Sequence, residues 1–146
     1  MGFTILSWPG PRPSRPSIGE DTVQINKSGE LTPTGTEGNA VSPVATPSTG
    51  AADVSVIHQR QAPGCIGPHH HHDREEVVLL LTGSVAVHTS EERAELQSGD
   101  SVILPAGQIH QVETLGTEPA EWLLIAPSGV GFFGADGQRV TPLWAA

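Results

Sequence analysis

Four consecutive histidines, residues 69–72, stand directly before an acidic pair and an aliphatic run in the stretch PGCIGPHHHHDREEVVLLLTG. In an extended strand, residues two apart face the same side, so only alternate histidines can point at one site. Neutral imidazoles combined with a carboxylate are natural ligands for a first-row divalent transition metal. The stretch therefore predicts a metal site. Its first two ligands come from one of two pairs, His69 with His71 or His70 with His72.

Two further ligands are expected downstream of the histidine run. Glu76 stands at the start of EEVVLLLTG, and His110 lies in GDSVILPAGQIHQV. Alternation along these strands places Val78 and Leu80 on the face of Glu76, and Val112 on the face of His110. We therefore expect the metal at one end of a largely apolar cavity. No Arg or Lys is expected inside it, which favours a small apolar or aromatic substrate over a sugar phosphate.

The segments that must position these residues are short and rich in Val, Ile and Leu, with Gly, Pro, Ser or Thr between them. Such runs are typical of antiparallel strands in an all-β sandwich or barrel. No convincing amphipathic helix is present, and SEERAELQSG is interpreted as a turn with an edge strand. The expected strands are DVSVIHQR, EEVVLLLTG, SVAVHT, DSVILPAG, IHQVET and EWLLIAP.

Composition divides the 146 residues into three parts around one core, since a chain of this length fits a single domain. Residues 1–50 are rich in Pro, Gly, Ser and Thr and are predicted to form an extended arm, in which GFTILSW and DTVQIN could each pair as a strand. Residues 51–130 are expected to form the barrel. Residues 131–146 are expected to be a tail that packs on it through Phe132, Phe133 and Trp144. An arm of this length predicts a homodimer, because it can cover an exposed sheet edge of a second subunit.

The charge balance argues against two classes of partner. The chain has sixteen acidic and seven basic residues, which gives a formal net charge of −9. Its Lys and Arg residues form no cluster along the sequence. Nucleic acid and membrane are therefore not expected as partners. No secretion signal or membrane-spanning run is evident, and Cys65 is the single cysteine, so a cytoplasmic location is expected.

Two spaced motifs resemble those of the cupin superfamily, whose single-domain bacterial members are about this long. The first family motif is a glycine, five residues, His-x-His, three or four residues, Glu, six residues and Gly. The second is a glycine, five residues, Pro-x-Gly, two residues, His, three residues and Asn. The first is matched by Gly64, His70, His72, Glu76 and Gly83, and the second by Gly99, Pro105, Gly107 and His110, with Thr114 in place of Asn. The resemblance covers roughly residues 53–127.

This resemblance implies a cupin-type antiparallel β-barrel, also described as a double-stranded β-helix or jelly-roll-like sandwich, preceded by the arm. It implies a metal held by His70, His72, Glu76 and His110. A site built on His69 and His71 remains an alternative, although the upstream glycine then falls one residue short of its place. Zinc is the expected metal; iron, nickel, manganese, cobalt and copper are the other candidates.

The resemblance is compatible with several reactions. The favoured hypothesis is a polyketide cyclase or aromatase that uses the metal as a Lewis acid and a histidine as acid/base. The candidates for that histidine are His69, His71 and, if it points inward, His58. One alternative is a quercetinase-like ring-cleaving dioxygenase, for which three histidines and one glutamate are the customary ligands. The other is a cupin that binds a small molecule without turnover.

Overall fold

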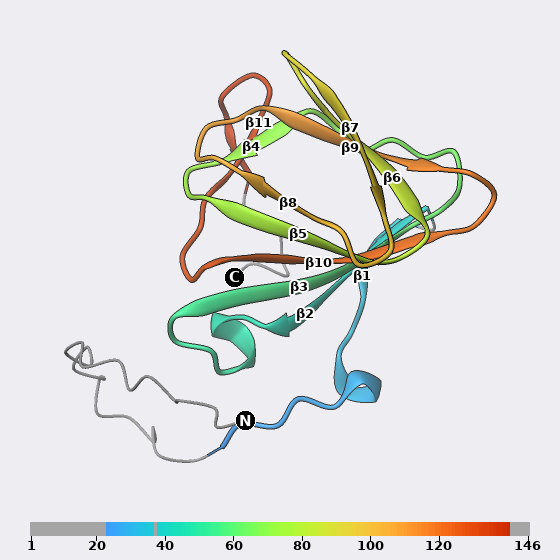
Figure 1. Cartoon of the computed structure of the whole chain (residues 1–146). Coiled ribbons are helices and arrows are strands. Elements are labelled where there is room, and N and C mark those ends of the chain that lie inside the picture. Colours follow the sequence, from blue (N-terminus) through green and yellow to red (C-terminus); the bar gives the residue numbers. More distant parts are fainter. Residues whose placement is uncertain (1–22, 37, 141–146) are drawn as a thin grey trace, which may run out of the picture.

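A computed structural model describes residues 23–36 and 38–140 of the chain. It confirms an all-β fold, in which two six-stranded antiparallel sheets face each other (Figure 1). In spatial order, the first sheet contains β1 (Thr34–Thr36), β2 (Asn39–Ala45), β3 (Val54–Gln61), β10 (Ala120–Pro127), β5 (Glu76–Thr82) and β8 (Ser101–Leu104). The second contains β12 (Arg139–Val140), β11 (Phe132–Gly134), β4 (His70–His72), β9 (His110–Leu115), β6 (Ser84–Thr89) and β7 (Arg93–Gln97). Two short 3-10 helices, η1 (Ser28–Glu30) and η2 (Pro47–Thr49), complete the described elements.

Burial alternates along the strands with the period of two that the sequence shows. In β9 and β10, and in β5 as far as Leu80, every second residue is buried, because those side chains point between the sheets. Glu76, Val78 and Leu80 share the inner face of β5, as expected. SEERAELQSG contains β7, an edge strand, also as expected. Turn glycines with positive φ, such as Gly83 and Gly107, link the strands.

The inner faces form two apolar clusters. The first surrounds Leu80 and Trp122 and consists of Val78, Leu80, Val85, Val87, Leu96, Leu104, Val112, Ala120 and Trp122. The second lies toward β2 and β11 and consists of Val41, Ile57, Leu124, Ala126, Val130 and Phe132. Both clusters meet on β10, whose inner side chains pass from Trp122 to Leu124.

The structure places part of the segment assigned to the N-terminal arm in the sheet itself. Residues 39–45 form β2, which pairs with β3 over most of its length, and β1 pairs with β2. The described part of DTVQIN, residues 23–26, forms no strand, and Val23 and Ile25 are exposed. That possibility is therefore wrong for these residues, whereas GFTILSW lies outside the described residues.

The C-terminal segment also joins the barrel. β11 pairs with β4 so that Phe132 lies opposite His72 and Phe133 opposite His71. Phe132 is buried, whereas Trp144 lies outside the described residues. Residues beyond the predicted barrel segment thus contact the strand that carries the histidines.

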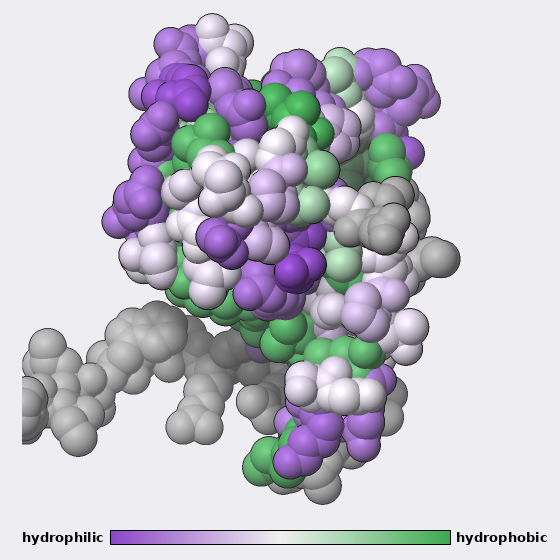
Figure 2. Space-filling view, turned by 90° about the vertical axis from the view of Figure 1, so that its right-hand side faces the viewer, coloured by the Kyte–Doolittle hydropathy of each residue, from purple (hydrophilic) through white to green (hydrophobic). Residues whose placement is uncertain are grey.

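The surface is mixed in character. On the face shown in Figure 2, small apolar areas are interspersed with hydrophilic side chains. Among the described residues, no helix has the length and hydropathy that crossing a membrane requires.

Candidate metal centre

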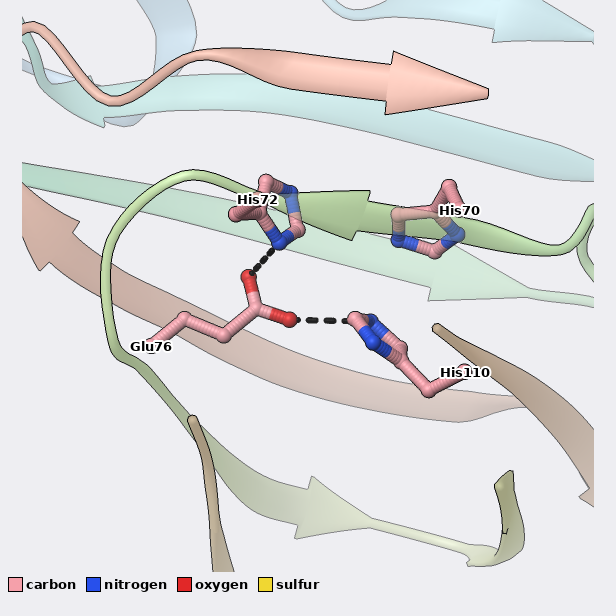
Figure 3. A group of neighbouring side chains, drawn as sticks. All are labelled: His70, His72, Glu76 and His110. Carbon is pink, nitrogen blue, oxygen red and sulfur yellow. Dashed lines mark ion pairs between the residues drawn. The ribbon is translucent and has the colours of Figure 1, made fainter. Parts of the chain in front are cut away.

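Three strands bring together the four residues that the motif spacing selected. His70 and His72 come from β4, Glu76 begins β5, and His110 begins β9 directly opposite His70. Their ligand atoms all lie within 4.8 Å of one another (Figure 3). The histidines belong to one sheet and the carboxylate to the facing sheet, so the group bridges the interior of the barrel.

Glu76 lies at the centre of this group and is 1% exposed. One carboxylate oxygen is 2.6 Å from His72 Nδ1, and the other is 2.9 Å from His110 Nε2. His72 and His110 are each 2% exposed. A buried carboxylate is stable only when cations or donors compensate its charge, and these imidazoles are its described partners.

Two of the imidazoles are oriented by backbone carbonyls. His70 Nδ1 donates to the Pro68 carbonyl at 2.9 Å, and His110 Nδ1 donates to the Gln108 carbonyl at 2.9 Å. Because a carbonyl can only accept, Nδ1 carries the proton in both rings. This leaves Nε2 as the nitrogen that can bind a metal, the arrangement usual for metal-binding histidines.

The surroundings shift the pKa values of three of these groups. Burial, aided by the nearby His110, lowers the pKa of His70 to about 4. Burial raises the pKa of Glu76, but the short contacts with His110 and His72 outweigh it and lower the value to about 2. Burial lowers the pKa of His110, but the adjacent Glu76 carboxylate outweighs it and raises the value above 6.5. At neutral pH, Glu76 is therefore ionised and His70 is neutral, as metal ligands must be.

Several buried polar atoms of the group have no aligned hydrogen bond within the described part of the chain. They are both ring nitrogens of His72 and both carboxylate oxygens of Glu76. His72 Nδ1 and the Glu76 oxygen are close enough to attract each other, but their geometry is not that of a hydrogen bond. Buried polar atoms without partners are rare. These atoms, in a set of three imidazoles and a carboxylate, fit a divalent transition metal.

A cavity of about 420 Å³ borders the cluster, with His70 and His72 in its wall. Most of its other side chains are apolar: Val41, Pro68, Leu124, Phe132, Phe133 and Val140. No Lys, Arg, Asp or Glu of the described residues lines this cavity. A narrower pocket of about 40 Å³ adjoins His70, Glu76 and His110. The expected largely apolar cavity beside the cluster is therefore present.

The three histidines considered for acid/base chemistry lie in different places. His69 is exposed and lines the wide cavity together with His70 and His72. His71 points away from this pair and stacks on Phe133, with ring centroids 5.1 Å apart. His58 alternates on β3 with Gln59 and Gln61, which line the narrow pocket, and its Nε2 lies 3.5 Å from a Glu121 oxygen. The structure thus brings only His69 to the cavity.

Sequence reasoning missed three amide side chains in the cavity walls, Asn39, Gln59 and Gln61. The two glutamines could have been found, because alternation places them on the face of β3 opposite His58. Asn39 gave no signal, since its segment was assigned to the arm.

The comparison with protein families agrees with this geometry. The family model described as the cupin domain matches residues 57–126, which contain all four candidate ligands. Residues 57–126 of the chain form a cupin domain. No curated protein matches the sequence.

Solved cupin structures resemble the chain in fold. The polyketide cyclase RemF from Streptomyces resistomycificus aligns with a TM-score of 0.67 at 15% identity, over 85% of this chain and 90% of RemF. KdgF from Halomonas sp. aligns with a TM-score of 0.60 at 18% identity, over 69% and 91% of the two chains. A Bacillus subtilis oxalate decarboxylase variant aligns with a TM-score of 0.65 at 22% identity, over 74% of this cupin but 30% of that enzyme. Identities this low establish the fold and leave the reaction open.

Proposed function

We propose that this cupin is a metal-dependent cyclase that closes an aromatic ring in a polyketide-like β-carbonyl substrate. The observation that carries the proposal is the cluster of three histidines and Glu76 beside a mostly apolar cavity of about 420 Å³. A divalent metal held by these four residues would supply Lewis-acid polarisation of a carbonyl oxygen. Zinc suits this role, since the reaction requires no change of oxidation state.

The residues around the cluster have separate tasks in this proposal. The apolar walls bind the hydrocarbon part of the substrate and exclude water from it. His69, which lines the cavity without belonging to the cluster, removes a proton from the carbon between two carbonyl groups. That carbon then bonds to a distant carbonyl carbon, whose oxygen receives a proton. Loss of water and a shift of hydrogen complete the aromatic ring.

Similarity to RemF supports this choice among cupin reactions. The match to RemF covers 85% of this chain and 90% of that polyketide cyclase, so the two are alike in extent as well as in fold. The match to the oxalate decarboxylase variant covers 30% of that enzyme. The proposal nevertheless rests on the cavity and its cluster, because fold alone does not select a reaction.

The test uses a small surrogate substrate, benzoylacetone with an acetonyl arm at the ortho position of its ring. The zinc-loaded protein should convert it without oxygen to an acetyl-methyl-naphthol, which absorbs and fluoresces differently from the open chain. We expect His69→Gln to slow this reaction by about 10²- to 10⁴-fold while zinc stays bound. His71→Gln is the matched control and should retain the rate, because His71 does not line the cavity and reaches it only through the ring of Phe133.

The absence of any acceleration by protein with stoichiometric zinc would contradict the cyclase. Equal losses in His69→Gln and His71→Gln would contradict the role of His69 while leaving the reaction itself standing.

A quercetinase-like dioxygenase is the second candidate, favoured by the ligand set of three histidines and one glutamate. It requires a redox-active metal and should consume oxygen with a flavonol, whereas the cyclase should work anaerobically with zinc. A cupin that only binds its ligand would retain the surrogate without converting it under either condition.

A further inference from the structure

Three amide side chains line the narrow pocket that adjoins the histidine cluster. Asn39 from β2 and Gln59 and Gln61 from β3 line the narrow pocket together with His70 and His110. Asn39 and Gln59 also line the wide cavity. A pocket of about 40 Å³ holds a few water-sized groups or one polar substituent of a larger ligand.

Asn39 and Gln59 form a pair with unused hydrogen-bonding capacity. Gln59 Nε2 donates to Asn39 Oδ1 at 2.6 Å, and neither side chain has another hydrogen bond with the described residues. One amide hydrogen bond joins one nitrogen to one oxygen, whichever residue donates. In either orientation, the pair retains a free carbonyl oxygen and a free NH₂ group. It can therefore both accept from and donate to a ligand.

Gln61 extends this polar surface and is itself fixed. It is 1% exposed, and its Nε2 donates to the carbonyls of Cys65 at 2.7 Å and Val112 at 3.1 Å. Since both partners can only accept, the nitrogen must face them, and Oε1 is the polar atom that remains. No described residue donates to Oε1, although the Gln61 side chain lines the narrow pocket.

These amides are neutral, no Lys, Arg or Asp of the described chain lines either pocket, and Glu76 is the one Glu of that part that does. From this arrangement we infer that Asn39 and Gln59 bind a hydroxyl or carbonyl oxygen of an uncharged aromatic ligand, beside the metal cluster. The cavity walls contact its rings, and Gln61, opposite Asn39 in the β2–β3 register, extends the polar surface. This inference rests on the proposed function for the aromatic class of the ligand, but it requires no turnover and no bound metal.

The experiment compares two probes of similar size, 2-naphthol and 2-fluoronaphthalene. The fluoro compound has the same ring system but cannot donate a hydrogen bond. Affinities for the full chain are measured by fluorescence titration, first with the protein as purified and then after chelator treatment. We expect wild-type protein to prefer 2-naphthol by about tenfold in both states, as one or two hydrogen bonds in a low-dielectric site would produce.

The variant that tests the site combines Asn39→Leu with Gln59→Met, which keep side-chain volume and remove the polar atoms. In this variant the two probes should bind with about equal affinity, and the affinity for 2-fluoronaphthalene should be retained. Gln97→Met is the matched control, because Gln97 is exposed on the edge strand β7. Gln61 is left unchanged, since its bonds to two backbone carbonyls support the fold.

The inference is overturned if wild-type protein shows no preference, if neither probe binds, or if the preference survives in the double variant. If the preference for 2-naphthol disappears after chelator treatment, the metal and not the amide pair binds the oxygen, and the inference is likewise overturned. Should the double variant fail to fold, Gln59→Met alone must still reduce the preference. None of these results measures ring closure. A negative result in this experiment therefore does not contradict the cyclase proposal, which the assay with the surrogate substrate tests separately.

Discussion

The two apolar clusters of the barrel fill space differently. In the first, Leu80 and Val85 are fully buried, and Trp122 of β10 lies opposite Leu80 of β5. In the second, three of the six members, Val41, Leu124 and Phe132, also line the wide cavity. None of the first cluster lines the wide cavity, and only Val78, Val112 and Trp122 border the narrow pocket. The first cluster is thus the more closed core and the second the wall of the wide cavity, and His70 borders both pockets.

This difference follows the boundary of the cupin match. Every residue of the closed core lies within residues 57–126, as do all four candidate ligands. Half of the second cluster lies outside that segment, at Val41, Val130 and Phe132. The superfamily segment therefore provides the scaffold and the candidate metal centre, while the flanking segments complete the wall of the wide cavity.

The largest effect is expected on metal binding, from a change in the histidine cluster. His110→Ala removes one of three imidazoles and should weaken metal binding by more than about a hundredfold, since loss of a mere supporting residue already has an effect of 10- to 100-fold. Metal per subunit, measured by inductively coupled plasma mass spectrometry on untagged protein, gives the result. The circular dichroism spectrum should remain that of a β protein, because the closed core is untouched. Full metal retention would contradict the site.

A matched pair of truncations compares the clusters directly. Leu80→Ala opens a cavity in the closed core and should lower the free energy of unfolding by about 3–5 kcal/mol. Leu124→Ala should lower it by about 2 kcal/mol, because that side chain already borders open space. Urea unfolding of both variants measures the difference. Equal losses would show that the second cluster is packed as tightly as the first.

The metal-free protein should lose stability as the pH falls. The pKa of His70 is about 4 in the folded state and 6.5 ordinarily, and that of Glu76 is about 2 against 4.5. In both cases the unfolded chain binds more protons, so folding is weakened on acidification, first between about pH 6.5 and 4 and then between about 4.5 and 2. The urea midpoint should fall across this range.

Glu76→Gln should remove the lower part of that dependence, whereas Glu75→Gln, which changes an exposed neighbour, should keep it. A urea midpoint in wild-type protein that does not change with pH would contradict the assigned environment of the cluster.

The smallest effect on stability is expected from shortening the N-terminal arm. Removing residues 1–22 leaves Asn26, whose side chain bonds to the carbonyls of Val44 and Thr49 beside η2. We expect a shift from dimer to monomer in sedimentation with an unchanged circular dichroism spectrum, because the arm is predicted to join subunits and the described barrel does not depend on it. An unchanged dimer would refute the role of these residues without refuting the dimer.

The sequence by itself predicted the fold class through strand alternation, and its resemblance to the cupin motifs favoured His70 and His72 over His69 and His71, because both signals are short-range patterns. Alternation along EEVVLLLTG placed Glu76 on the face of Val78 and Leu80, as the structure confirms. The motif spacing selected four residues whose ligand atoms lie within 4.8 Å of one another. Residues two apart in a strand share a face whatever the rest of the chain does, so such patterns are visible without tertiary contacts.

Only the tertiary structure decided which segments complete the cavity and which spare histidine reaches it. Pairing of β2 with β3 brings Asn39 beside Gln59 from a segment whose composition indicated an arm. Pairing of β11 with β4 places Phe133 against His71 and leaves His69 at the cavity. These contacts join residues that are 20 to 62 positions apart, because strand pairing depends on the partners available in the folded chain rather than on local composition.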